Sequence, residues 1–187
     1  SDLGLIKNNF KHTHTKLSKN LSSFDLIITS GGVSKSRIDH IGNFFSISGK
    51  VNFWQLALKP GRPFAFGELN NIPFIGLPGN PVAAVITFLM LVVNYLQKLS
   101  GIKRTQIIER LIPSNFEMEK KAGRTEWLRG SLKIINNNYF LEKFHTSGSG
   151  IISSISNTDG IIEINENIKY VKKGTLLKFY RYEDILS

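Results

Sequence analysis

Two glycine-containing loops, each directly following an apolar run typical of a strand, constrain this chain more than any other feature. Ser30-Gly31-Gly32-Val33-Ser34 follows Leu26–Thr29, and Pro78-Gly79-Asn80-Pro81 follows Phe74–Leu77. In an open parallel sheet, the loops at the carboxyl ends of the strands line the ligand crevice. Two such loops can converge on one anion, so we expect the functional site at that edge.

The composition excludes several classes of protein. The chain has 187 residues, 41% of them hydrophobic, and no cysteine, so it can bury a core but can form no disulfide or thiolate metal site. The net charge is +10, yet lysine and arginine are spread without a basic run or a reading motif. We therefore expect no nucleic-acid partner, and an anionic small substrate suits the positive field.

The apolar run Val82–Leu96 carries no charge. It is shorter than the roughly 20 residues that a membrane helix needs, so we expect a buried helix and no membrane partner. No targeting signal is visible at Ser1–Gly4, and a cytoplasmic location fits this sequence.

The order of the predicted elements indicates an α/β domain over residues 1–101 and a small β domain over residues 102–187. The first comprises a strand end at Leu3–Ile6, helices at Phe10–Leu21 and Ile38–Ser48, strands at Asp25–Thr29, Val51–Leu58, Pro63–Glu68 and Ile72–Leu77, and a helix at Val82–Leu99. Asn70-Asn71 predicts a hairpin turn, and Ser100-Gly101 predicts a helix end. The second contains short alternating stretches at Ile107–Pro113, Glu126–Ile135, Tyr139–Phe144, Gly160–Ile164 and Leu176–Tyr180.

Each glycine loop allows two interpretations. Gly31 and Gly32 lack a Cβ, so their N–H groups can approach an oxyanion closely, and Ser34 adds a hydroxyl; the alternative is a tight turn between strand and helix. Asn80 is a good N-cap and Pro81 suits the first helical position, so this second loop either caps a helix or binds a ligand.

Charged residues lie near both loops. Lys59-Pro60-Gly61-Arg62 holds two cations on a stiff turn, where Lys59 offers a point charge and Arg62 a two-pronged clamp on phosphate; the alternative is a solvated turn. Asp39 could cap the helix that follows the first loop, or it could hold Mg²⁺ against a diphosphate.

Taken together, these motifs resemble the MoeA and gephyrin E-domain family, the molybdopterin molybdenumtransferases. The resemblance rests on the stretches Asp25–Ser34, Leu58–Pro63 and Gly76–Pro81 together with Asp39, in the same order along the chain. The later stretches Arg124–Gly130 and Gly148–Gly150 are similar to the C-terminal β domain of that family. The implied fold is a three-layer sheet domain of the molybdopterin-binding type without its first strand and helix, followed by a β-barrel-like domain.

The resemblance implies insertion of molybdenum from molybdate into adenylylated molybdopterin, with Mg²⁺ assistance and release of AMP. It implies catalytic roles for Asp39, as the metal ligand, and for Lys59. The substrate-binding residues that it implies are Gly31, Gly32, Val33, Ser34, Pro60, Gly61, Arg62, Pro78, Gly79, Asn80, Pro81, Arg124 and Ser149.

Two departures from the family pattern are Gln55, where the family often has a basic residue, and Ser36, where it often has glycine. We expect a fragment of a longer, homodimeric protein, because the family carries a dimer-forming region before this point; the piece alone could bind ligand without turnover. The alternatives are the related molybdopterin adenylyltransferase, which shares the Gly-Gly-Val-Ser loop, and a non-catalytic, gephyrin-like scaffold module.

Overall fold

The computed structural model describes residues 1–5, 15, 23–32, 49–103, 107–145 and 150–187, with the backbone alone at 51–54. The helices predicted at 10–21 and 38–48 lie outside these residues, apart from position 15, which is helical. The predicted strand end at Leu3–Ile6 is not formed over residues 3–5. Gly4 has a φ of 67° and donates its N–H to Asp2 Oδ1 at 2.6 Å, which is a turn.

The chain divides into two compact units, one of residues 1–56 and 61–79 and the other of residues 57–60 and 80–187. These units do not coincide with the predicted domains 1–101 and 102–187. The difference arises because the helix after residue 80 packs with the β strands that follow it, and because a short strand at 58–59 joins the sheet of those strands.

The first unit is built on a four-stranded mixed sheet in the order β1-β5-β4-β2. The strands are β1 (Ile27–Ser30), β2 (Gly49–Gln55), β4 (Pro63–Leu69) and β5 (Ile72–Leu77). Among the strands that the structure describes in this sheet, only β1 and β5 run parallel, so the sheet is not wholly parallel. Asn70 and Asn71 join β4 to β5 with φ values of 49° and 65°, as the two-residue turn of a hairpin requires. That predicted hairpin is confirmed.

The strand predicted at Val51–Leu58 ends early, at Gln55. The Leu56 N–H donates to the Arg62 carbonyl at 3.0 Å and so closes a loop over residues 57–61. Leu58 and Lys59 form the separate strand β3, which pairs in parallel with β8 (Thr125–Ile135) of the second unit. The stretch predicted as one strand therefore contains two strands, and each of them belongs to a different sheet.

The second unit begins with one continuous helix, made of α3 (Pro81–Thr87), the π-helical turn η2 (Phe88–Val92) and α4 (Val93–Leu99). The Asn80 side chain accepts the Ala83 N–H at 3.3 Å, which caps the start of the helix. At the end, Gly101 has a φ of 78°, and the Gly101 and Ile102 N–H groups bond to the carbonyls of Lys98 and Gln97. The predicted helix and its stop signal are confirmed, whereas the π turn was not expected.

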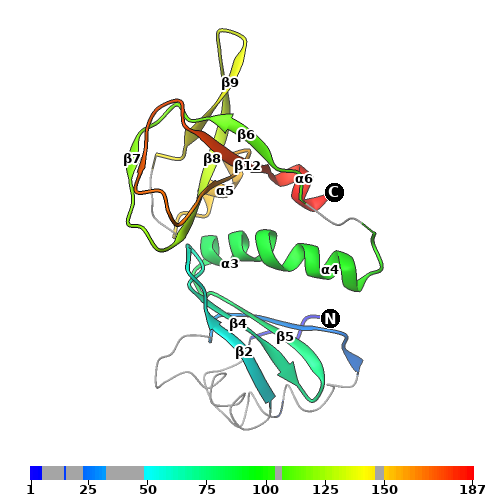
Figure 1. The fold of residues 1–187 in the computed structure, drawn as a ribbon. Coiled ribbons are helices and arrows are strands. Elements are labelled where there is room, and N and C mark those ends of the chain that lie inside the picture. Colours follow the sequence, from blue (N-terminus) through cyan, green and yellow to red (C-terminus); the bar gives the residue numbers. More distant parts are fainter. Residues whose placement is uncertain (6–14, 16–22, 33–48, 104–106, 146–149) are drawn as a thin grey trace. The chain divides into compact units, whose positions relative to one another are not determined.

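The rest of this unit is mainly a six-stranded sheet in the order β3-β8-β10-β12-β6, with β9 paired to β8 (Figure 1). Asn115 N–H donates to the Leu141 carbonyl at 2.8 Å, which brings the chain after β6 to β9 and closes the sheet into a barrel-like shape. The remaining elements are β6 (Arg110–Pro113), β7 (Met118–Glu119), β9 (Asn138–Lys143), α5 (Ser153–Ser156), β10 (Gly160–Ile164), β11 (Tyr170–Val171), β12 (Leu176–Arg181) and α6 (Tyr182–Leu186).

Each face of the β8-β10-β12 sheet buries its own core. On one face the helix packs Val82, Ile86, Leu89 and Val93 against residues of β8, β10, β12 and α6, namely Trp127, Ile161, Tyr180 and Ile185. The other face buries Phe116, Leu141, Ile162, Ile164, Val171, Leu177 and Phe179.

The 19-residue helix Pro81–Leu99 is long and apolar enough to cross a membrane by length and composition. Its packing against this sheet is that of a core helix.

Candidate functional site

The two glycine loops lie side by side in the first unit. Strands β1 and β5 pair in parallel with Ser30 opposite Leu77, so both strands end at the same edge of the sheet. The Gly31 N–H donates to the Leu77 carbonyl at 3.0 Å. A Cβ at Gly31 would lie 3.7 Å from Gly79 Cα, and a Cβ at Gly79 would lie 3.4 Å from Gly31 Cα. The convergence expected from the sequence is therefore present in the fold.

The conformation of the first loop depends on glycine. Gly31 and Gly32 have φ values of 83° and 72°, in the left-handed region that side chains disfavour. Gly32 and Gly79 are exposed, and within the described residues their N–H groups have no hydrogen-bond acceptor. Backbone N–H groups in turn conformations of this kind can bind an anion. Whether Gly31, Gly32, Pro78 and Gly79 bind ligand stays a prediction.

The Asn80 side chain is engaged in capping, as its hydrogen bond to Ala83 shows. Pro81 is the first residue of α3 and is exposed. The capping interpretation of this loop therefore holds, and any ligand contact of Asn80 and Pro81 would be additional to it.

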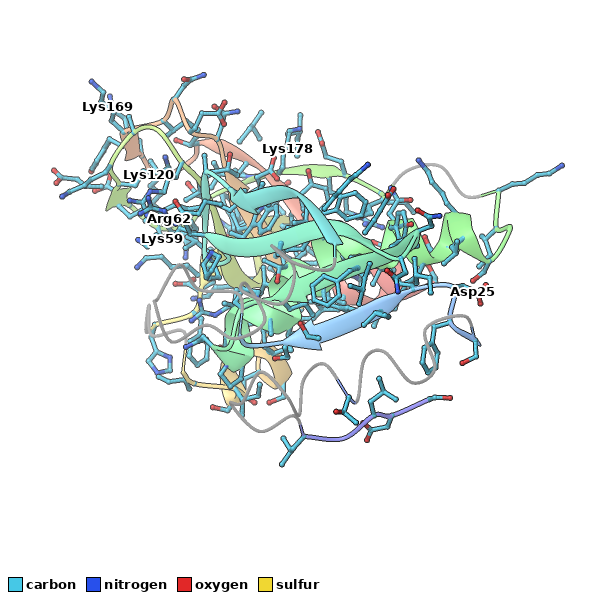
Figure 2. All side chains as sticks on the ribbon, turned by 90° about the horizontal axis from the view of Figure 1, so that it is seen from below. Asp25, Lys59, Arg62, Lys120, Lys169 and Lys178 are labelled. Carbon is cyan, nitrogen blue, oxygen red and sulfur yellow. The ribbon has the colours of Figure 1, made fainter. Side chains whose placement is uncertain are left out.

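Lys59 forms an ion pair in the second unit. Its position on β3 is opposite Glu126 on β8, and Lys59 Nζ lies 3.2 Å from both carboxylate oxygens of Glu126. The Lys59 side chain is 59% exposed and the Glu126 side chain only 6%. Figure 2 labels Lys59. The predicted catalytic cation is thus not a free point charge, because a buried carboxylate holds it.

Arg62 belongs to the first unit and is exposed (Figure 2). Its Nη2 lies 3.4 Å from Gln55 Oε1, so the residue that departs from the family pattern contacts the predicted clamp. Between Lys59 and Arg62, the Lys59–Pro60 peptide bond is cis and Gly61 has a φ of 108°, which makes the turn dependent on glycine. Joint action of Lys59 and Arg62 stays a prediction, since they belong to different units.

Arg124 lies in the loop before β8 and is exposed. The ammonium of Lys120, a largely buried residue, donates to the Arg124 carbonyl at 2.9 Å and to the Lys121 carbonyl at 3.3 Å. Across the loop, Thr125 Oγ1 donates to Glu166 Oε2 at 2.9 Å. Hydrogen bonds from its own backbone N–H and from Thr125 lower the pKa of Glu166. Lys120 and Glu166 thus fix the backbone that presents Arg124.

Sequence reasoning missed a buried arginine on the same strand. Arg129 is 4% exposed, and its Nε donates to Ser154 Oγ at 3.1 Å, while Ser154 Oγ donates to the Ile151 carbonyl. Burial lowers the pKa of the Arg129 guanidinium and raises that of the neighbouring Tyr182. The alternation of side chains along a strand predicts that Arg129 is buried, because it lies on the same side of the strand as Trp127, two residues before it.

Four predicted site residues, Val33, Ser34, Asp39 and Ser149, lie outside the described residues. Within the part of the chain that the structure describes, no group of three histidine, aspartate or glutamate side chains is placed to hold a metal ion. Among the described residues, the predicted site residues of the first unit thus offer backbone N–H groups and Arg62, and those of the second unit offer Arg124 and the Lys59 ammonium paired with Glu126.

The fold and these groups define a class of protein: an α/β sheet domain with two adjacent glycine loops at the ends of two parallel strands, joined to a small β domain. Residues 1–98 match the family model described as a probable molybdopterin binding domain, and residues 112–182 match the MoeA C-terminal region, domain IV. The chain belongs to the family of these molybdopterin-binding domains.

Named relatives agree with this assignment. The chain is 33% identical over its whole length to a molybdopterin molybdenumtransferase of Haemophilus influenzae, and 28% identical over 87% of its length to one of Nostoc. It spans 46% and 39% of these proteins, which is less than half of each. A solved structure of the molybdopterin biosynthesis MoeA protein of Pyrococcus horikoshii matches 96% of the chain with a TM-score of 0.77 and 22% identity, and supports the fold. The match spans 43% of the length of that Pyrococcus protein.

Proposed function

We propose that this protein is a molybdopterin molybdenumtransferase, which inserts molybdenum from molybdate into adenylylated molybdopterin and releases AMP. The observation that carries the proposal is the contact between the loops at Gly31 and Gly79, because it gathers backbone donors at one edge of the sheet. The relatives named above are called molybdopterin molybdenumtransferases, which supports the proposal.

The chemistry of the proposed ligands suits these donors. Adenylylated molybdopterin carries a diphosphate and molybdate is a dianion, so both need hydrogen-bond donors and positive charge. The Gly32 and Gly79 N–H groups would bind oxyanions, and Lys59, Arg62 and Arg124 would supply cations. Catalysis would then rest on positioning and on electrostatic stabilisation of the charge that develops on the leaving phosphate.

Mg²⁺ is proposed as the cofactor, held by Asp39. This ion usually takes one or two carboxylates together with substrate oxygens and water, so a single aspartate beside a diphosphate is an adequate protein contribution. The bound ion would neutralise negative charge on the phosphoanhydride. A cytoplasmic location and a homodimer of the full-length protein belong to the same proposal.

The proposal is tested by incubating the full-length protein with adenylylated molybdopterin, molybdate and Mg²⁺ and measuring AMP by chromatography. We expect molybdate-dependent AMP release, and a strong loss in Gly79→Val, whose branched side chain would project between the touching loops. Consumption of ATP with molybdopterin, without molybdate-dependent AMP release, would instead assign the adenylyltransferase reaction.

A further inference from the structure

A buried carboxylate lies beside an exposed lysine where β3 meets β8. Lys59 Nζ is 3.2 Å from both Glu126 oxygens, and the two residues face each other in the ladder. The Lys59 side chain is 59% exposed, about ten times the 6% of the Glu126 side chain. The Lys59 ammonium therefore contacts a buried carboxylate, although most of the Lys59 side chain is exposed.

The burial of Glu126 makes this pair more than a surface contact. A buried carboxylate needs a donor to replace the water it has lost. In the described residues, Lys59 Nζ is the one donor that the Glu126 carboxylate has. The backbone holds both partners, because the Thr125 N–H donates to the Ala57 carbonyl at 3.0 Å and Leu58 pairs with Thr125. Lys59 is thus fixed at its backbone and at its ammonium.

We propose that Glu126 is a positioning residue, which holds the Lys59 ammonium so that its remaining N–H donor addresses an oxyanion of the ligand. The inference rests on the proposed function, in which Lys59 contacts an anionic group. An ammonium has three donors and a carboxylate engages at most two of them here, so one remains. A lysine that is already fixed loses less rotamer freedom when the anion binds.

The sign of one substitution separates positioning from simple charge. If Glu126 acted only through its charge, Glu126→Gln would strengthen anion binding, because a nearby negative charge is removed. If Glu126 positions Lys59, the same substitution weakens anion binding, because the ammonium is no longer fixed. The two effects predict opposite shifts in affinity.

The experiment compares Glu126→Gln, Lys59→Met, the double variant and the unchanged chain, with inorganic diphosphate as the probe in titration calorimetry. We expect Glu126→Gln to weaken diphosphate binding by roughly three- to tenfold, as for the loss of an ordered hydrogen bond to a charged group. In the Lys59→Met background it should have no further effect. Glu183→Gln is the matched control, since it removes a carboxylate from the exposed Arg181 pair and should leave affinity unchanged.

A second readout does not depend on any ligand. The rate at which Lys59 is acylated by acetic anhydride, followed by peptide mass spectrometry, should rise in Glu126→Gln, because the Lys59 side chain is no longer held against a buried carboxylate and is more accessible to the reagent. Glu126→Asp, which keeps the charge and shortens the side chain, should give an intermediate rate and affinity. Thermal unfolding of every variant shows whether it is folded, and Glu126→Asp carries the test if Glu126→Gln does not fold.

Tighter or unchanged diphosphate binding in Glu126→Gln would overturn the inference, as would an equal weakening in the Lys59→Met background or an unchanged acylation rate. Failure of the proposed function looks different. In that case Lys59→Met itself leaves diphosphate binding unchanged, while the acylation rate of Lys59 still rises when Glu126 is replaced.

Discussion

Gly160, at the start of β10, shows how a single position excludes every side chain. A Cβ there would lie 2.2 Å from the Tyr180 carbonyl oxygen and 3.0 Å from Arg181 Cα. Both contacts are with backbone of the adjacent strand, where Gly160 is opposite Arg181. Because backbone atoms of a paired strand cannot turn aside as a side chain can, β10 and β12 would have to separate.

We therefore predict that Gly160→Ala lowers the free energy of unfolding by about 2–4 kcal/mol, in the range typical of steric strain in a core. The measurement is urea denaturation of the chain. Gly150→Ala is the control, because a Cβ at Gly150 would meet no described residue within 4 Å, and we expect a change of less than about 0.5 kcal/mol there. Equal stability of the two variants would contradict the strain argument.

Ion pairing at the residue scale could not be predicted from the sequence. Lys59 and Glu126 are far apart along the chain, and their contact depends on the pairing of β3 with β8. The turn of Lys59-Pro60-Gly61-Arg62 was predicted correctly as a turn, since proline and glycine act locally. The partner of its lysine comes from tertiary structure, which no local pattern encodes.

At the scale of elements, local signals predicted the structure well where they were strong. The Asn70-Asn71 hairpin, β5 and the Pro81–Leu99 helix with its glycine stop all follow from turn, periodicity and capping chemistry within a few residues. The same Asn-Asn signal recurs at Asn136-Asn137, with φ values of 48° and 61°, and joins β8 to β9. The break between β2 and β3 was missed, because it depends on the loop that Leu56 and Arg62 close.

The start of the helix allows capping to be separated from ligand binding. Asn80 accepts the Ala83 N–H, so Asn80→Ala should lower the free energy of unfolding by about 1 kcal/mol, while Asn80→Ser, which is also a good N-cap and adds no charge, should retain the cap. Chemical denaturation of both variants measures this. If Asn80→Ser keeps its stability yet binds diphosphate more weakly than the unchanged chain, the side chain has a role beyond capping. Full stability of Asn80→Ala would contradict the capping role.

At the scale of the whole molecule, the helix Pro81–Leu99 determines where a stable unit begins. Its buried face covers Trp127, Ile161, Tyr180 and Ile185, so the β strands after residue 101 lack one of their two cores without it. The domain boundary near residue 101, where the pattern changes from helix to short strands, stays a prediction. Periodicity reveals elements but does not show which sheet a helix covers.

This packing predicts a difference between two pieces of the chain. A piece of residues 80–187 should unfold cooperatively, whereas a piece of residues 102–187 should melt at least about 10 °C lower, since several kcal/mol of apolar burial are lost. Both pieces lack β3, so the comparison isolates the helix. Of the two tryptophans in the chain, only Trp127 is in either piece, and its fluorescence should be blue-shifted in 80–187 and red-shifted in 102–187. Equal melting temperatures with a buried Trp127 in both pieces would show that the β strands form their core without the helix.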